Sequence, residues 1–466
     1  MPNPVKGRKM TESKKETFFT HDRSFYRALF PLLITLSLQN LIAYSVNMAD
    51  NIMLGSYSQP ALSGAAAVNQ IFFIVQQLTL GICDGLVVLA AQYWGEGRTS
   101  PIRRLTGTAL RFGVCCSAVI IVLCMVFPSQ IVGIFTKDPV IIAEGTSYLS
   151  IIQFTFLIFM LTQVLMASLR SVEVVRISFY ISIVSLIVNV GINYTLIFGR
   201  FGFPEMGIRG AAIGTLTARI IEFLIIFIYA LKVDKRLQLF SESLIKRDAA
   251  LSSDYFKAEI PMLLSSLLWA VSVPMQTAIL GHLSSDAIAA NSVATTFYQY
   301  LKVIVQSMSA ASAVMIGRAI GMGKMERVRS DARTLSVIDI LIGLILGLLL
   351  FVLRHPLLSL YRIDDSALQL ADQLIVIMSI VMVFMSYQMP VSFGIIRGGG
   401  DVRFTMIMNM ISTWAIVMPL SFLSAFVWKW SVPMVVIVIQ SDQIFKGIPT
   451  FIRFRSYKWI RKLTRD

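Results

Sequence analysis

The chain has few charged residues for its length. Asp, Glu, Lys and Arg make up 14% of the 466 residues, whereas soluble proteins carry about 25%. Hydrophobic residues make up 56%, and the mean hydropathy is +0.72. This scarcity of charge excludes a soluble globular domain and predicts an integral membrane protein.

Histidine and cysteine are also scarce. The chain has His21, His282 and His355, scattered over a tail and two loops, and Cys83, Cys115, Cys116 and Cys124. None of them stands in metal-ligand spacing or in a nucleophile–base cluster, so neither a metal centre nor a membrane-embedded enzyme is expected. We expect the four thiols to pack as small apolar groups.

Long apolar runs account for most of the sequence. A membrane-spanning helix needs about 20 mostly apolar residues, and twelve such runs are found. They lie near 28–49, 61–90, 105–127, 146–168, 177–199, 210–231, 258–280, 287–316, 335–353, 370–393, 404–427 and 431–452. The runs are apolar throughout and do not alternate, which excludes a membrane β-barrel. The sequence therefore predicts an all-α protein with twelve transmembrane helices.

The net charge of +15 reflects topology. Most of the 41 Lys and Arg lie in the two tails and in alternate loops, while the opposite loops hold only Lys137, Arg200, Arg209, Arg354, Arg362 and Lys429. This is the positive-inside pattern, and it predicts that both termini are cytoplasmic in a multi-pass plasma membrane protein. The basic balance does not indicate a nucleic-acid partner. The first 26 residues lack an apolar signal-peptide core, so the first span is expected to act as the anchor.

The second half of the chain repeats the first. An offset of 226 pairs Leu54-Gly55 with Leu280-Gly281 and Gly95 with Gly321, and an offset of 227 pairs Arg170 with Arg397. Six spans per half is an even number, so the halves have the same orientation. They are expected to be related by a pseudo-two-fold axis along the membrane normal, with a central cavity between them. The predicted parts are a tail (1–27), an N-lobe (28–231), a cytoplasmic connector (232–257), a C-lobe (258–452) and a second tail (453–466).

Asp50 is the first candidate site residue. It lies in VNMADNIMLG at the end of the first apolar run, and a carboxylate in the hydrocarbon layer costs on the order of 3 kcal/mol. The repeat places Gln276 at the equivalent position, so the acid belongs to the first half alone. Asp50 either faces a cavity or caps a helix at the interface. Asn189 and Asn193 in the fifth run supply oxygen ligands, or else hydrogen bonds between helices.

Asp84 is a second acid within an apolar run, and Gln77 lies two turns before it. We interpret Asp84, Gln77 and Gln276 as substrate or relay candidates. The alternative for Asp84 is an ion pair with Lys302 or Arg219. Arg219 with Glu222, and Asp442 with Lys446, have the spacing of ion pairs along a helix.

Four motifs resemble the bacterial branch of the multidrug and toxic compound extrusion (MATE) family over about residues 28–452. They are ADNIMLG (49–55), AAQYWGEGR (90–98), IVNVGINYTLIFGRFGFPEMGIRGAAIGT (187–215) and IIRGGGDVRF (395–404). The resemblance implies two six-helix bundles in a V shape and antiport of cationic or amphipathic molecules against Na⁺ or H⁺. It also implies that cation coupling falls on Asp50, Asn189, Asn193 and Thr215, with any Na⁺ held at the first three.

Two departures from the family pattern concern the C-lobe. Acids that NorM-type members carry in the seventh and tenth helices correspond here to Trp269 and Ser386. The N-lobe is therefore expected to carry coupling alone. A lipid-linked oligosaccharide flippase of the same superfamily is the alternative function, and it would need a strongly cationic cavity. We expect no cofactor, a monomer, and the bilayer and a small molecule as the only partners.

Overall fold

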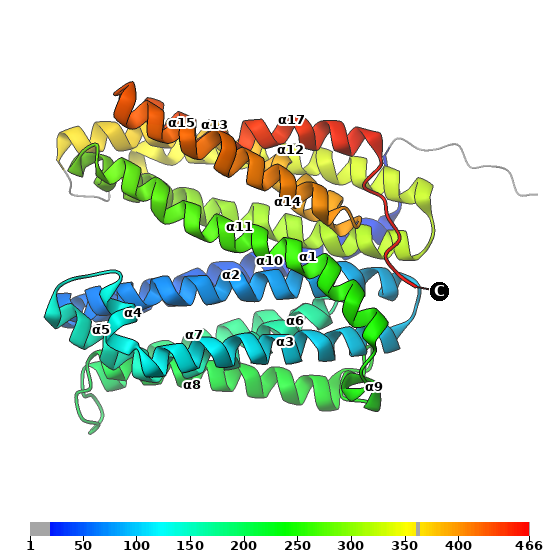
Figure 1. Ribbon diagram of the computed structural model, residues 1–466, viewed down its shortest axis with the longest axis horizontal. Helices are drawn as coiled ribbons and strands as arrows, with labels where there is room; N and C mark the ends of the chain where they lie inside the picture. The colour runs from blue at the N-terminus through cyan, green and yellow to red at the C-terminus, as the bar shows by residue number, and fades with distance from the viewer. Residues whose placement is uncertain (1–18, 360–363, 466) are drawn as a thin grey trace, which may run out of the picture.

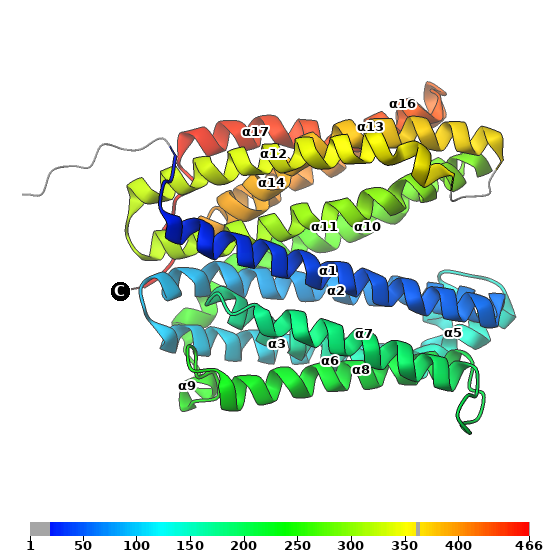
Figure 2. The same ribbon diagram turned by 180° about the vertical axis from the view of Figure 1, so that it is seen from behind.

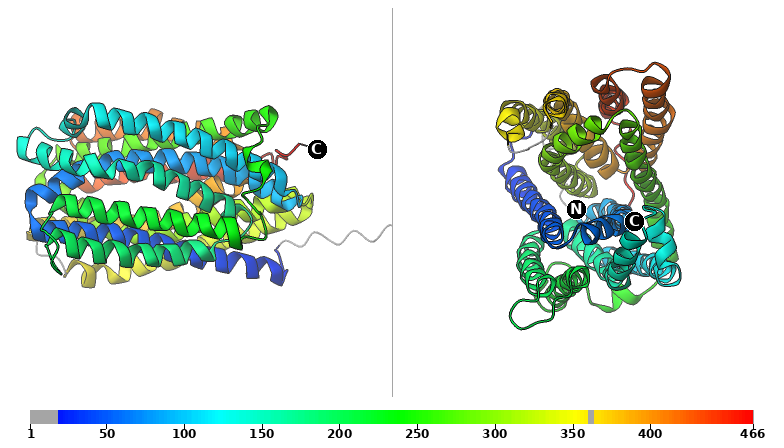
Figure 3. Two further views of the ribbon diagram at one scale, coloured as in Figure 1. Left: turned by 90° about the horizontal axis from the view of Figure 1, so that it is seen from below. Right: turned by 90° about the vertical axis from the view of Figure 1, so that its left-hand side faces the viewer.

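The computed structural model describes residues 19–359 and 364–465, and every regular element in these ranges is a helix. Twelve helices are long and apolar enough to cross a membrane, which confirms the predicted count. Figure 1 shows them lying roughly parallel in two groups, and the end-on view in Figure 3 shows the same two groups. The predicted architecture of two helical lobes is present.

The N-lobe contains α1 (Arg23–Tyr57), α2 (Gln59–Gly95), α3 (Thr99–Val126), α4 (Pro128–Gly133), α5 (Pro139–Ile152), α6 (Phe154–Ser171), α7 (Arg176–Ile197) and α8 (Ile208–Ile228), which continues as the π-helical η1 (Tyr229–Val233). The predicted fourth span, 146–168, is broken at Gln153 into α5 and α6. Asp138 caps the N-terminus of α5, where its carboxylate accepts a hydrogen bond from the Val140 N–H (2.8 Å).

The C-lobe contains α10 (Ala249–Gly281), α11 (Ser285–Gly321), α12 (Met325–Leu358), α13 (Asp365–Met389) with η2 (Pro390–Ile396), α14 (Val402–Met410) with η3 (Ile411–Val417), α15 (Met418–Phe422) with η4 (Leu423–Val427), α16 (Val432–Gln440) and α17 (Asp442–Ser456). The short α9 (Glu242–Ile245) lies between the lobes in sequence. The predicted seventh span, 258–280, is thus too short, because α10 begins at Ala249.

Helix caps explain three of these starts. Asp248 accepts hydrogen bonds from the Ala250 and Leu251 N–H groups (both 3.1 Å), and the Leu251 N–H beside it lowers the pKa of this carboxyl. Ser58 caps α2 and Ser284 caps α11, each through the N–H three residues on. These two serines are 226 positions apart, so the repeat extends to the caps.

The first helix of each half crosses from one lobe to the other. One end of the molecule holds α9 and the first and last described residues of the chain, and we call it the terminal end. There Leu29 and Leu33 of α1 are buried with C-lobe residues such as Ala311. Leu251 and Tyr255 of α10 are buried there in the N-lobe core. Figure 2 shows α1, and Figure 1 shows α10, running obliquely toward the opposite end. Each lobe therefore includes one helix that also packs on its partner.

Glycines bring the lobes together at the terminal end. A Cβ on Gly95 of α2 would lie 2.9 Å from the Gly321 Cα of α11, and one on Gly317 would lie 2.8 Å from the Ala91 Cβ. Side chains at these glycines would force the helices apart. The C-terminal segment adds hydrogen bonds, since the Leu463 N–H donates to the Gln92 Oε1 (2.8 Å). The terminal end is closed by contacts between the lobes.

Candidate functional site

Asp50 lies in a polar cluster inside the N-lobe, which we call the Asp50 cluster: Asp50 of α1, Asn189 and Asn193 of α7, and Thr215 of α8. The Asn193 Nδ2 donates to the Asp50 Oδ1 (2.5 Å), and the Asn189 Nδ2 donates to the Thr215 Oγ1 (3.3 Å). Asp50 is half-buried, while Asn189 and Asn193 are 1% and 0% exposed. The structure therefore brings together four residues that the sequence assigned to one site.

The packing of α8 on α7 depends on a glycine in this cluster. A Cβ on Gly214 would lie 2.0 Å from the Asn193 Oδ1, so any other residue would push α8 away from α7. The Asn193 Oδ1 is buried and has no hydrogen-bond partner among the described residues. A free amide oxygen beside a carboxylate is a ligand arrangement that a hard cation prefers.

Arg219 follows Thr215 by one turn of α8. Its positive charge attracts the Asp50 carboxylate electrostatically. Its guanidinium pairs with the Glu222 carboxylate (2.8 Å), as the sequence predicts, and lies over the rings of Phe72 and Phe159. Tyr148 of α5 is buried and lies near Thr215. Sequence reasoning missed Tyr148, because a lone tyrosine in an apolar span carries no distinguishing pattern.

Asp84 does not join the Asp50 cluster. Its carboxylate pairs with the Arg397 guanidinium (2.7 Å), and both side chains are 15% exposed. The alternative interpretation of Asp84 was an ion pair with Lys302 or Arg219. An ion pair does form, but those two partners are wrong: Arg219 pairs with Glu222, and Lys302 lies 5.3 Å from the centre of the Trp269 ring. Asp84 belongs to α2 and Arg397 to the C-lobe, so the pair links the lobes.

Gln77 and Gln276 are half-buried on α2 and α10. Among the described residues, no hydrogen bond joins either side chain to the Asp50 cluster. Their proposed role in binding substrate stays a prediction.

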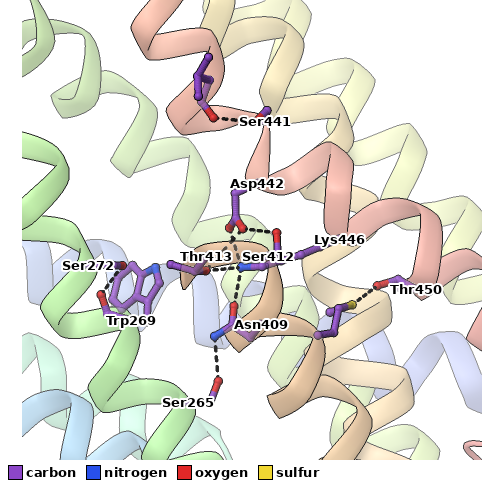
Figure 4. A network of polar contacts seen from close by, with 12 residues as sticks. Ser265, Trp269, Ser272, Asn409, Ser412, Thr413, Ser441, Asp442, Lys446 and Thr450 are labelled. Carbon is purple, nitrogen blue, oxygen red and sulfur yellow. Dashed lines mark hydrogen bonds and ion pairs between the residues drawn. The ribbon is translucent and has the colours of Figure 1, made fainter. Parts of the chain in front are cut away.

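A second polar cluster lies in the C-lobe (Figure 4). The Lys446 Nζ contacts the Asp442 Oδ2 (2.5 Å), which confirms the pair expected from their spacing, and also the Asn409 Oδ1 and the Thr413 Oγ1. The Ser412 Oγ donates to the other oxygen of Asp442 (2.7 Å). An offset of 227 converts Thr215 to Asp442 and Arg219 to Lys446. The two halves thus place polar groups at matching points of their last helices.

Two buried acids were missed in the sequence interpretation. Glu259 of α10 and Asp339 of α12 are 0% and 1% exposed, and neither carboxylate has a hydrogen-bond partner among the described residues. Both lie inside predicted apolar runs, so an acidic residue at that position in the sequence was enough to identify each as a candidate. Ser386 of α13 packs near Asp339, because a Cβ on Gly343, one turn along α12, would lie 2.6 Å from the Ser386 Cβ.

Comparison with known proteins identifies the family and several relatives of the chain. The MatE family model matches residues 36–195 and 261–423. The chain is 25% identical over 431 residues to the Probable multidrug resistance protein NorM of Thermotoga maritima, covering 92% of each chain. It is 24% identical to the Probable multidrug resistance protein YoeA of Bacillus subtilis, covering 88% of this chain and 90% of that protein.

Solved structures share the fold. A crystal structure of the Vibrio cholerae MATE transporter VcmN in the bent form superposes with a TM-score of 0.83 at 18% identity, covering 93% of this chain and 97% of that one. A MOP superfamily transporter from Pyrococcus furiosus, described as having a binding pocket of reverse polarity, superposes with a TM-score of 0.82 at 16% identity, covering 94% and 98%. At these identities the likeness shows the fold alone.

Proposed function

Since this chain belongs to the MATE family of multidrug transporters, we propose that it exports cationic or amphipathic small molecules by antiport against H⁺ or Na⁺. It is a multi-pass membrane transporter of small molecules and not an enzyme. We further propose that both termini are cytoplasmic, which makes the terminal end the inner end. Each chain contains both lobes, so a monomer is sufficient for transport.

The observation that carries the proposal is the Asp50 cluster. The Asp50 carboxylate there is half-buried and accepts a hydrogen bond from the fully buried Asn193, with the buried Asn189 beside it. Burial favours the neutral state of a carboxylic acid. Binding of a proton or of a cation neutralises the Asp50 carboxylate and is therefore favoured by its burial. Asp50, the oxygens of Asn189 and Asn193, and Thr215 suit Na⁺ as hard ligands, and the same carboxylate suits H⁺.

The path of α1 suggests how ion binding at Asp50 reaches the opposite lobe. Asp50 contacts Asn193 of α7 in the N-lobe, whereas Leu29 and Leu33 on the same helix pack in the C-lobe. Neutralising Asp50 changes its hydrogen bonding with Asn193 and therefore the fit of α1 on α7. A shift of α1 would be transmitted to the C-lobe, which supports alternating access by rocking of the lobes.

The flippase alternative is less well supported. A pyrophosphate group needs several free cations. Of the three basic residues that the sequence places deep within spans, Lys446 pairs with Asp442. Arg219 pairs with Glu222, and Lys302 lies over Trp269.

Transport by the purified protein tests the proposal. Proteoliposomes loaded with a fluorescent organic cation are given an imposed pH gradient or an imposed Na⁺ gradient, one at a time. We expect efflux to be driven by one of the two gradients and to be lost in protein-free vesicles. Efflux that is insensitive to both gradients would contradict antiport.

A further inference from the structure

Glu259 is buried between the lobes near the terminal end. It lies on the part of α10 that packs against the N-lobe, and a Cβ on Gly85 of α2 would lie 2.8 Å from the Glu259 Cβ. The residue is 0% exposed, and neither carboxylate oxygen has a partner among the described residues. The carboxyl group is therefore enclosed by the contact that closes this end of the molecule.

No opposite charge compensates Glu259 within the described part of the chain. The titratable groups that interact with it are Tyr255 of α10 and Cys116 of α3, and neither carries a positive charge. Asp84, which precedes Gly85 on α2, is itself an acid and is paired with Arg397. An ionised carboxylate enclosed without a partner is strongly disfavoured, and such a group takes up a proton instead.

The internal repeat supplies a comparison for this contact. An offset of 226 converts Leu33 to Glu259 and Gly85 to Ala311. Leu33 of α1 and Ala311 of α11 are buried together at the equivalent contact on the other side of the molecule. Both residues at that point are apolar, so the fold does not require an acid there. Only one of the two otherwise similar interfaces contains an acid at this position.

We propose that Glu259 is a proton-binding site whose occupancy is linked to closure of the lobes at the terminal end. When the lobes close, the carboxylate takes up H⁺ and is buried as the neutral acid. When they separate, it meets water and releases H⁺. This site rests on the proposed alternating access and adds regulation to it. It exchanges protons with one side only, so it sets the ratio of closed to open molecules without carrying a proton across the membrane.

Spin labels test the site in the full-length protein. Labels are attached to Lys235→Cys, just after the last N-lobe helix, and to Lys324→Cys in the C-lobe, both exposed near the terminal end, with the four native cysteines replaced by Ala. Distance distributions are measured from about pH 5 to 9. We expect the short-distance population to decrease as pH rises, because deprotonation opposes closure, with at most a tenfold change in its ratio per pH unit for a single proton.

Variants isolate the contribution of Glu259. Glu259→Gln has the size of the acid and is always neutral, and Glu259→Leu copies the residue at the repeat-equivalent position. Both are expected to keep the short distance at high pH and to lose most of the pH dependence. The exposed acid Glu326 gives the control, Glu326→Gln, which should behave as the parent protein. Identical pH dependence in the parent and in Glu259→Gln, or opening of both variants at all pH values, would overturn the proposal.

Efflux assays on the same preparations separate this proposal from the proposed function. Coupled efflux together with pH-independent distances would overturn the Glu259 site and leave antiport in place. Distances that depend on Glu259, without efflux under either gradient, would retain the site and contradict antiport.

Discussion

Asp84 of α2 and Arg397, which follows η2, form an ion pair of 2.7 Å that joins the two lobes. Both side chains are only 15% exposed. Removing one partner would leave a poorly hydrated charge, which costs about 3 kcal/mol or more for a buried pair. The pair therefore stabilises the arrangement in which the lobes meet at the terminal end.

The first prediction concerns this pair. Asp84→Asn should lower the population of the closed arrangement, seen as a loss of the short distance between labels at 235 and 324. Arg397→Gln added to Asp84→Asn should restore part of that population, since no unpaired charge remains. A double variant as open as the single one would show that the ion pair does not hold the lobes together.

A second prediction concerns the C-lobe cluster. Lys446 is 3% exposed, and Lys446→Gln leaves Asp442 without its cation. We expect this change to lower the free energy of unfolding by about 3–5 kcal/mol, measured by thermal unfolding in detergent. Arg98→Gln, which breaks the more exposed pair with Glu96, is the comparison and should cost about 1 kcal/mol or less. Equal losses would contradict a structural role for the buried cluster.

Topology gives a third prediction. Reporter fusions after Arg247, in the segment between the lobes, and at the C-terminus should both show a cytoplasmic location. The reason is that Lys and Arg are concentrated in the tails and in alternate loops. An external location of either fusion would invert the proposed orientation.

The fourth prediction concerns how ion coupling is divided between the N-lobe and the C-lobe. Ser386→Ala and Asp339→Asn should leave gradient-driven efflux within about twofold, because we assign coupling to the N-lobe. Asp339→Asn is the stricter of the two tests, since Asp339 is a buried acid without a hydrogen-bond partner among the described residues. A loss of more than about tenfold, equivalent to roughly 1.4 kcal/mol, would place part of the coupling in the C-lobe.

The sequence predicted the fold well because its determinants are local. Apolar runs of sufficient length specify spans, and the constant offset of the repeat specifies two lobes. The break at Gln153 was not predicted, since both sides of it are equally apolar. The start of α10 at Ala249 was missed because the first turns of that helix are polar.

The candidate site was predicted only in part, for a different physical reason. Asp50, Asn189, Asn193 and Thr215 do come together, as their positions in the resembled motifs implied. The partner of Asp84 could not be deduced, because Arg397 is more than 300 positions away and apolar runs do not indicate which helix faces which. The enclosure of Glu259 depends likewise on the contact with Gly85, which only the packed lobes reveal.

Asp50→Asn tests the central claim most directly. The amide keeps the size and hydrogen bonding of the side chain and fixes it in a neutral state, so the protein should still insert, fold and bind substrate. Efflux of the fluorescent cation against its gradient should nevertheless collapse under both the imposed pH gradient and the imposed Na⁺ gradient. If Asp50→Asn protein in proteoliposomes still concentrates the cation against its gradient, Asp50 is not the coupling residue.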